Sequence, residues 1–240
     1  MPTSTPAPRA PRVHIEDPRN WAISQGTDFW LGASPSTAVL AGTAGAGQLL
    51  SEYGWTTTAL AHVAGTGADF NSSADPGVPA YIQFTAASDL LLSPSIFGDY
   101  AHFLQASRIL GYTPTTLNLE CLAAFLTEAA DEVSSAFGFV QAGASPITAA
   151  AAGQFACISS DATNFELNSS AAADSGAVSD NAWHVWKISI SSAASEWFID
   201  GTSQGSIALV ADVFPLRFGC GIVAAGSNTI ALNSVHIWYE

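Results

Sequence analysis

Hydrophobic and polar residues alternate with a period of two along the C-terminal part of the chain. In segment 183–190 (WHVWKISI), His184, Trp186, Ile188 and Ile190 share one face, and Lys187 lies among the residues of the other. Such alternation of aromatic and β-branched residues is typical of a half-buried strand. Segment 196–199 (EWFI) follows and ends at Asp200-Gly201, which favours a tight turn. We therefore predict two strands and a turn here.

Similar short apolar segments, broken by Gly, Pro, Asn, Asp and Ser, recur from about residue 21 to the C-terminus. Strands are predicted at 28–33, 80–85, 117–126, 136–141, 154–159, 164–168, 206–210, 216–220, 229–232 and 235–239. This spacing predicts an all-β, two-sheet antiparallel jelly-roll sandwich in one domain, 21–240. Segment 94–110 fits a short helix or a strand, and the Ala-rich stretches 148–153 and 171–173 are predicted to be loops.

Residues 1–20 differ from the rest of the chain. The first twelve residues hold four prolines and two arginines and show no apolar periodicity. Proline fixes φ and lacks a backbone donor, so we predict an extended, polyproline-like arm. Its arginines, Arg9, Arg12 and Arg19, are the predicted partner-binding residues, pairing with acidic groups of a neighbouring subunit.

Charge is scarce and mostly negative. Charged residues make up 11% of the chain, hydrophobic residues 48%, and the net charge is −14. A surface of Ser, Thr, Asn, Gly and Ala suits protein–protein contact, although an Ala/Gly compositional bias explains it equally well. Beyond the arm only Lys187, Arg108 and Arg217 are basic, so we predict no nucleic-acid binding. No apolar run reaches membrane length and no signal peptide is recognised, so we predict neither membrane association nor export.

Cysteine and histidine spacing gives no metal motif. Cys121, Cys157 and Cys220 lack a CxxC pair and are predicted to be buried thiols, in preference to a disulfide or metal site. None of the five histidines pairs with another His or a Cys at ligand spacing, and His184 is predicted to be a hydrogen-bonded core residue. The oxygen-bearing residues of 161–168 match no calcium loop. We predict no metal and no cofactor.

No catalytic site is predicted from the sequence. The carboxylates Glu128, Asp131 and Glu132 cluster between two predicted strands, where a solvated turn is expected. We predict no GxSxG nucleophile elbow, and the glycine-rich stretch 42–47 lacks the GK[ST] of a phosphate loop. We therefore predict no catalytic residue and a chain that is not an enzyme.

Seven tryptophans remain as candidate binding residues. Trp183, Trp186, Trp197 and Trp238 lie in alternating segments and are predicted to pack in the core. Trp55, in the Tyr53-Gly54-Trp55 turn, is predicted to be exposed and is the residue we expect to contact a glycan.

The C-terminal half resembles a known fold family. The segments that carry the resemblance are 180–184 (DNAWH), 186–188 (WKI), 196–201 (EWFIDG), 214–216 (FPL) and 235–239 (VHIWY). Together they resemble the concanavalin A-like lectin/glucanase (laminin-G-like) jelly roll over roughly residues 115–240. The glucanase carboxylates and lectin metal ligands of that family are not matched. Within the family the chain is similar to virion proteins of tailed bacteriophages.

The resemblance implies a structural protein of the virion, assembled in the host cytoplasm. We expect a capsid decoration, cement or head-fibre protein that binds the major capsid protein or a tail protein and forms a homo-oligomer such as a trimer. The alternative is a carbohydrate-binding adhesin that recognises host-surface glycans. A glycan hydrolase would need two carboxylates within about 10 Å of each other.

Overall fold

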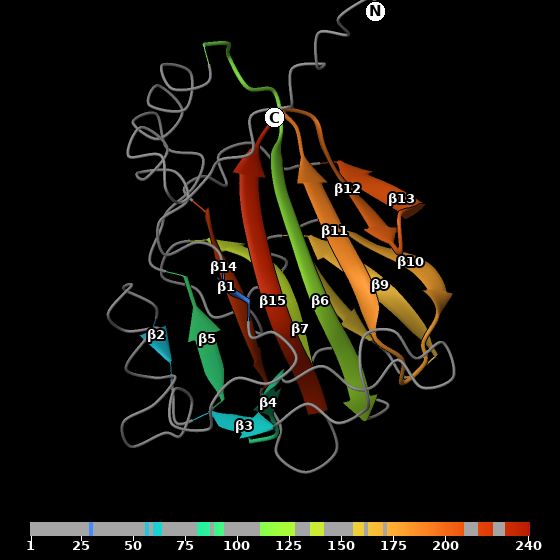
Figure 1. The fold of residues 1–240 in the computed structure, drawn as a ribbon. Coiled ribbons are helices and arrows are strands. Elements are labelled where there is room, and N and C mark those ends of the chain that lie inside the picture. The colour runs from blue at the N-terminus through green and yellow to red at the C-terminus, as the bar shows by residue number, and fades with distance from the viewer. Residues whose placement is uncertain are drawn as a thin grey trace, which may run out of the picture.

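The computed structural model is a sandwich of β-strands (Figure 1). It describes residues 29–30, 56–57, 60–63, 81–86, 89–93, 111–127, 135–141, 156–160, 163–169, 172–208, 216–222 and 229–240. These residues form fifteen strands in two antiparallel sheets, and no helix occurs among them. The predicted all-β, two-sheet antiparallel sandwich is confirmed.

The front sheet, which faces the viewer in Figure 1, has eight strands. Its order is β13 (Thr202–Ala208), β12 (Ala194–Ile199), β11 (His184–Ile190), β6 (Leu117–Thr127), β15 (Thr229–Tyr239), β4 (Tyr81–Phe84) and β3 (Ala61–Val63), and β1 (Phe29–Trp30) also pairs with β15. The two longest strands, β6 and β15, lie side by side at its centre.

The back sheet has seven strands. Its order is β10 (Ala172–Val178), β9 (Asn164–Ser169), β8 (Cys157–Ser160), β7 (Ser135–Gln141), β14 (Leu216–Ile222), β5 (Leu90–Leu92) and β2 (Thr56–Thr57). The two sheets pack with their inward-facing side chains interdigitated, as sandwiches do.

Trp186 occupies the centre of the core between the sheets. Its ring meets Phe125, Phe137 and Phe165 edge-on, with centroid separations of 6.0, 5.6 and 4.8 Å. The indole Nε1–H donates to the carbonyl of Ala123 at 2.9 Å, so the one polar atom of this buried side chain is satisfied. The alternation read from the sequence thus places Trp186 as predicted.

The strand pair at the C-terminus differs from the prediction. Segments 229–232 and 235–239 form one strand, β15, because a bulge between Leu232 and Ser234 absorbs the break in alternation without ending the pairing with β6. The turn at Asp200-Gly201 is confirmed, since both residues have positive φ, 50° and 80°, and connect β12 to β13.

The loop predicted at 171–173 is wrong, because residues from Ala172 onward form the edge strand β10. Its small residues show no hydrophobic alternation, so no strand is predicted there from the pattern alone. One of these residues, Gly176, must be small because a Cβ at this position would lie 2.5 Å from the ring of Trp197. The indole of Trp197 donates to Asp174 Oδ2 at 2.9 Å, which links β12 of the front sheet to β10 of the back sheet.

Several predictions lie outside the described residues. These are the arm with Arg9, Arg12 and Arg19, the exposed Trp55, segments 94–110 and 148–153, and the acidic cluster of Glu128, Asp131 and Glu132. All three cysteines are described and buried. Burial raises the pKa of each thiol.

Candidate functional site

Alternation along β6 decides which residues form the outer surface of the front sheet. Leu117, Leu119 and Cys121 belong to the core, so Asn118 and Glu120 point outward. The same argument applied to the neighbouring strands defines the outer face. Its members are Phe198 of β12, Lys187 of β11, Asn118 and Glu120 of β6, His236 and Trp238 of β15, Tyr81 of β4, and Trp183, which directly precedes β11.

One end of the outer face carries a stacked aromatic pair beside a lysine. The rings of His236 and Trp238 lie 4.7 Å apart with an interplanar angle of 23°. Lys187 Nζ lies 5.6 Å from the centroid of Trp238 and 5.5 Å from that of Phe198. The only lysine of the chain is therefore held between two rings by cation–π contacts.

Two carboxylates accompany this lysine. Glu120 is the cross-strand partner of both Lys187 and His236, so a carboxylate, an ammonium and an imidazole share one row across three strands. Glu196 of β12 lies on the far side of β11 and accepts a hydrogen bond from Ser203 Oγ at 3.2 Å. Both glutamates are exposed. The face thus combines aromatic surface with groups that donate, accept and transfer protons.

The other end of the outer face carries a second aromatic pair. Trp183 and Tyr81 meet edge-on with centroids 5.5 Å apart. They come from opposite sides of β6 and β15, whose residues at this level, Ala124 and Ala231, are small and fully buried. The alanines leave room for the rings to reach toward each other across the sheet, so this pair is a second apolar platform on the same face.

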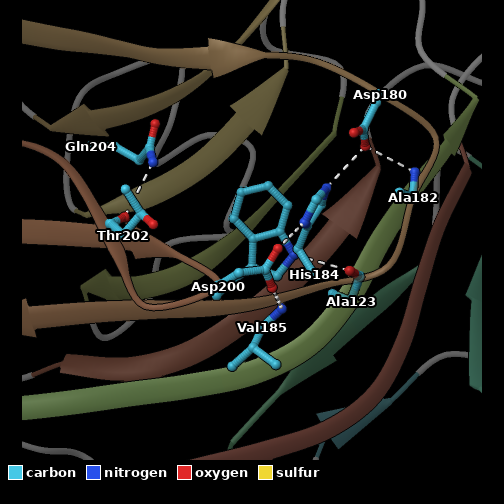
Figure 2. Close-up of polar contacts among 9 residues, drawn as sticks. Ala123, Asp180, Ala182, His184, Val185, Asp200, Thr202 and Gln204 are labelled. Carbon is cyan, nitrogen blue, oxygen red and sulfur yellow. Dashed lines mark hydrogen bonds and ion pairs between the residues drawn. The ribbon is translucent and has the colours of Figure 1, made fainter.

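A separate polar cluster surrounds His184 at the start of β11 (Figure 2). Its Nδ1 lies 2.6 Å from Asp200 Oδ2 and its Nε2 lies 2.9 Å from Asp180 Oδ1. Asp200 Oδ1 also accepts from the backbone N–H of Val185, and Asp180 Oδ1 from that of Ala182, both at 2.9 Å. The cluster ties the end of the β10–β11 connection to the β12–β13 turn.

The protonation of this cluster follows from its contacts. Partial burial lowers the pKa of His184, but the hydrogen bonds that its ring donates to Asp200 and Asp180 outweigh burial and the pKa is raised overall. Burial raises the pKa of both aspartates, but their bonds to His184 and to backbone N–H groups outweigh it and hold both below the ordinary value. With both ring nitrogens occupied, His184 has no free lone pair to act as a base, so the cluster is a structural clamp.

Neither cluster holds a metal-ligand set. No group of three or more His, Cys, Asp or Glu that could hold a metal ion occurs in the part of the chain that the structure describes. Within the same residues, no helix is long and apolar enough to cross a membrane.

The outer face was not found from the sequence. Trp183 and Trp238 were predicted to be core residues, and the structure places both half-buried on the outer face. The sequence did hold a signal for the outward position of Trp238. His236 and Trp238 alternate with Val235, Ile237 and Tyr239 along β15, so Trp238 shares its side of the strand with a polar residue. The predicted glycan contact Trp55 and the predicted partner-binding residues Arg9, Arg12 and Arg19 lie outside the described residues.

Comparison with known proteins identifies the fold but no family. No protein-family model matches the chain, and no curated protein matches it. The carbohydrate esterase of the Shiga toxin-encoding bacteriophage phi24B has a similar structure, with 13% identity and a TM-score of 0.51 over 89% of this chain and 97% of that one. An alginate lyase from Corynebacterium sp. matches at 11% identity and a TM-score of 0.45 over 67% and 77% of the two chains. A sialidase from Trypanosoma rangeli matches at 12% identity and a TM-score of 0.45, over 68% of this chain and 25% of the sialidase chain.

These comparisons correct one prediction. The chain was predicted not to be an enzyme, and that prediction is contradicted because the phage protein of similar structure is described as a carbohydrate esterase. Residues 201–205 (GTSQG) do match GxSxG, but they form the β12–β13 turn and the start of β13 and not the strand-to-helix elbow of that motif. The lack of a recognised elbow or carboxylate motif therefore does not exclude activity on this sandwich. At these identities the likeness shows the fold, a jelly-roll-like β-sandwich.

Proposed function

We propose that the chain is a carbohydrate-active protein of a tailed-phage virion and that a glycan lies along the outer face of the front sheet. The observation that carries the proposal is the Trp238–His236 stack with Lys187 and Glu120 beside it. Sugar rings present apolar C–H faces that pack on aromatic rings, and hydroxyl groups that need hydrogen-bond partners. The outer face supplies both kinds of partner in one place.

The extent of the face favours an oligosaccharide over a single sugar. Lys187, at the first platform, and Trp183, at the second, are four residues apart along the chain, about 13 Å along a strand. Between them Val185 and Leu122 leave an uncharged strip. A glycan chain that contacts both aromatic platforms therefore needs several sugar units.

Groups suited to acting on the glycan lie beside the first platform. Glu120 is directly opposite His236 in the strand register, so a carboxylate and an imidazole adjoin the ring on which a sugar would stack. Such groups act as general acids and bases when they reach the reacting atoms. The proposal therefore includes activity on the glycan, with Glu120 and His236 as the groups that transfer protons.

Two further observations support the proposal at the level of the fold. The sandwich is similar to that of the phage carbohydrate esterase, and segments 180–184 and 196–201 resemble the concanavalin A-like lectin/glucanase jelly roll. The place of the protein in the virion rests on the resemblance to tailed-phage virion proteins. Capsid decoration through residues 1–20 remains a prediction, because the arm lies outside the described residues.

The test is a binding and product assay against bacterial surface polysaccharides. The wild-type chain is applied to an array of such glycans, and the best binders are incubated with it and analysed by mass spectrometry for shortened chains or released acyl groups. We expect binding that Trp238→Ala abolishes, and products that Glu120→Gln no longer forms. Absence of any glycan binding by the wild type would overturn the proposal. Immunogold labelling of phage particles tests the virion location separately.

A further inference from the structure

A buried amide oxygen lies on the outer side of β6 without a hydrogen-bond partner. Asn118 is fully buried, and its Nδ2 donates to Thr116 Oγ1 at 3.2 Å. Thr116 Oγ1 in turn donates its single proton to the carbonyl of Glu240 at 3.2 Å, so it can only accept from Asn118. The orientation of the amide is thereby fixed. Among the described residues Asn118 Oδ1 has no donor, and it is closed to solvent.

Trp238 and Lys187 are neighbours of this residue on the outer face. Trp238 is the cross-strand partner of Asn118 on β15, Ser189 is its partner on β11, and Lys187 is the outward-facing residue next to Ser189. Since Lys187 Nζ lies 5.6 Å from the Trp238 ring, the side chains from β11 and β15 approach each other over β6, the strand that carries Asn118. The lysine and the indole are therefore placed to cover Asn118.

This cover is easily displaced. One side of the Trp238 ring stacks on His236, and the ammonium of Lys187 lies over the ring. A sugar that stacks on Trp238 would compete with Lys187 for the ring, and a cation–π contact at a partly exposed site is weak. Once Lys187 moves away, Asn118 Oδ1 becomes accessible next to the stacked sugar.

We propose that Asn118 Oδ1 accepts a hydrogen bond from a hydroxyl group of a neutral pyranoside that stacks on Trp238, and that Lys187 covers this oxygen until the sugar displaces it. The inference rests on the proposed function and deepens it by naming the ligand class and a specificity residue. A buried acceptor without a donor is costly, so a ligand that supplies the donor gains more there than at an exposed acceptor.

The charges around the site select a neutral sugar. Glu120 is directly opposite Lys187, Glu196 is opposite Ser189 on the same strand, and the chain as a whole carries a net charge of −14. Displacing Lys187 from the Trp238 ring moves its ammonium away from the stacked sugar, whereas the two carboxylates stay in place. A uronate would then meet repulsion where a neutral hexose meets none.

The experiment is a double-mutant cycle on sugar binding. Tetrasaccharides of glucose, galactose and mannose, each with its uronate counterpart, are titrated calorimetrically into wild type, Lys187→Ala, Asn118→Leu and the double variant. For the neutral sugar that binds best, we expect Lys187→Ala to tighten binding about fivefold, the scale of the exposed cation–π contact that the sugar otherwise displaces. Asn118→Leu should weaken binding in both the wild-type and the Lys187→Ala backgrounds, because it removes the hydrogen bond but not the competition for the ring.

A second measurement guards against a variant that fails to fold. In wild-type protein labelled with ¹⁵N, the side-chain amide signals of Asn118 should shift when the same neutral tetrasaccharide is added. An unchanged Asn118 signal, wild-type affinity in Asn118→Leu, no gain from Lys187→Ala, or tighter binding of a uronate would each overturn the inference. If Trp238→Ala still abolishes glycan binding in those cases, the proposed function stands. Failure of Trp238→Ala to weaken binding would overturn both.

Discussion

His184 Nδ1 lies 2.6 Å from Asp200 Oδ2, while its other ring nitrogen contacts Asp180, so one imidazole is held between two carboxylates. The histidine is mostly buried and the carboxylates are half exposed. This arrangement favours the charged imidazolium and makes the strength of the clamp depend on pH.

The sign of that dependence follows from the shifted pKa values. The pKa of His184 is raised on folding, so its contribution to stability is complete below about pH 6.5, the unfolded value, and is lost as pH rises through the folded value. The pKa values of Asp180 and Asp200 are lowered, so their contribution is complete above about pH 4 and is lost as pH falls through their folded values. We predict the clamp to be strongest near pH 5.

Urea unfolding between pH 5 and pH 9 measures this effect. Because the carboxylates are exposed, we expect the wild type to lose no more than about 1 kcal/mol from this cluster over that range. His184→Gln should abolish this cluster's loss of stability between pH 5 and pH 9, and any pH dependence from other groups should remain. A His184→Gln profile parallel to that of the wild type would show that the clamp does not titrate as described.

Trp186 should be the most sensitive position of the core. Trp186→Phe removes the donor to Ala123 and opens space among Phe125, Phe137 and Phe165. We predict a loss of about 2–4 kcal/mol in the free energy of unfolding. The neighbouring residue Val185 is partly exposed, and threonine keeps its β-branch. Val185→Thr should therefore change the free energy of unfolding by less than about 0.5 kcal/mol. Equal losses in the two variants would contradict the packing described.

Gly176 should tolerate no side chain. Alanine at this position would place a Cβ 2.5 Å from the ring of Trp197, which is fully buried and bonded to Asp174. We predict that Gly176→Ala lowers the free energy of unfolding by about 1–3 kcal/mol. Ser175→Ala, at the exposed adjacent position of β10, serves as the matched control. A neutral Gly176→Ala would mean that β10 does not pack against the front sheet as described.

The three cysteines should be unreactive in the folded chain. Cys121, Cys157 and Cys220 are buried, and burial raises the pKa of each thiol, so the reactive thiolate is scarce and inaccessible. With a thiol-specific chromogenic reagent at pH 8, we predict no reaction on the time scale of minutes until denaturant is added. Rapid reaction of one equivalent in native buffer would contradict the burial of that cysteine.

The strands that could be predicted from the sequence are those with clear hydrophobic alternation and a recognisable turn. Strands β11 and β12 were predicted because alternating aromatic and β-branched residues end at an Asp-Gly turn. Strand β10 and the start of β13 were missed because small and polar residues such as those of 202–205 give no alternation. Fold class required only the number and spacing of strands, so these omissions left it correct.

The candidate site could not be predicted because it depends on pairing between distant segments. Alternation shows that His236 and Trp238 share a side of a strand, but not which side faces the core. Lys187, Glu120 and His236 meet only because β6 pairs with β11 on one side and β15 on the other, across more than sixty residues of sequence. Strand order and register of that kind are not encoded in any short motif.

The central claim is that the outer face of the front sheet binds a glycan. Its most direct test is the affinity of the best array-binding polysaccharide for wild type, Trp238→Ala, Trp183→Ala and the control Tyr112→Ala, an exposed tyrosine that precedes β6. We predict that each tryptophan variant loses at least about tenfold in affinity and that Tyr112→Ala binds like the wild type. Wild-type affinity in both tryptophan variants would contradict the claim and place any glycan site elsewhere on the chain.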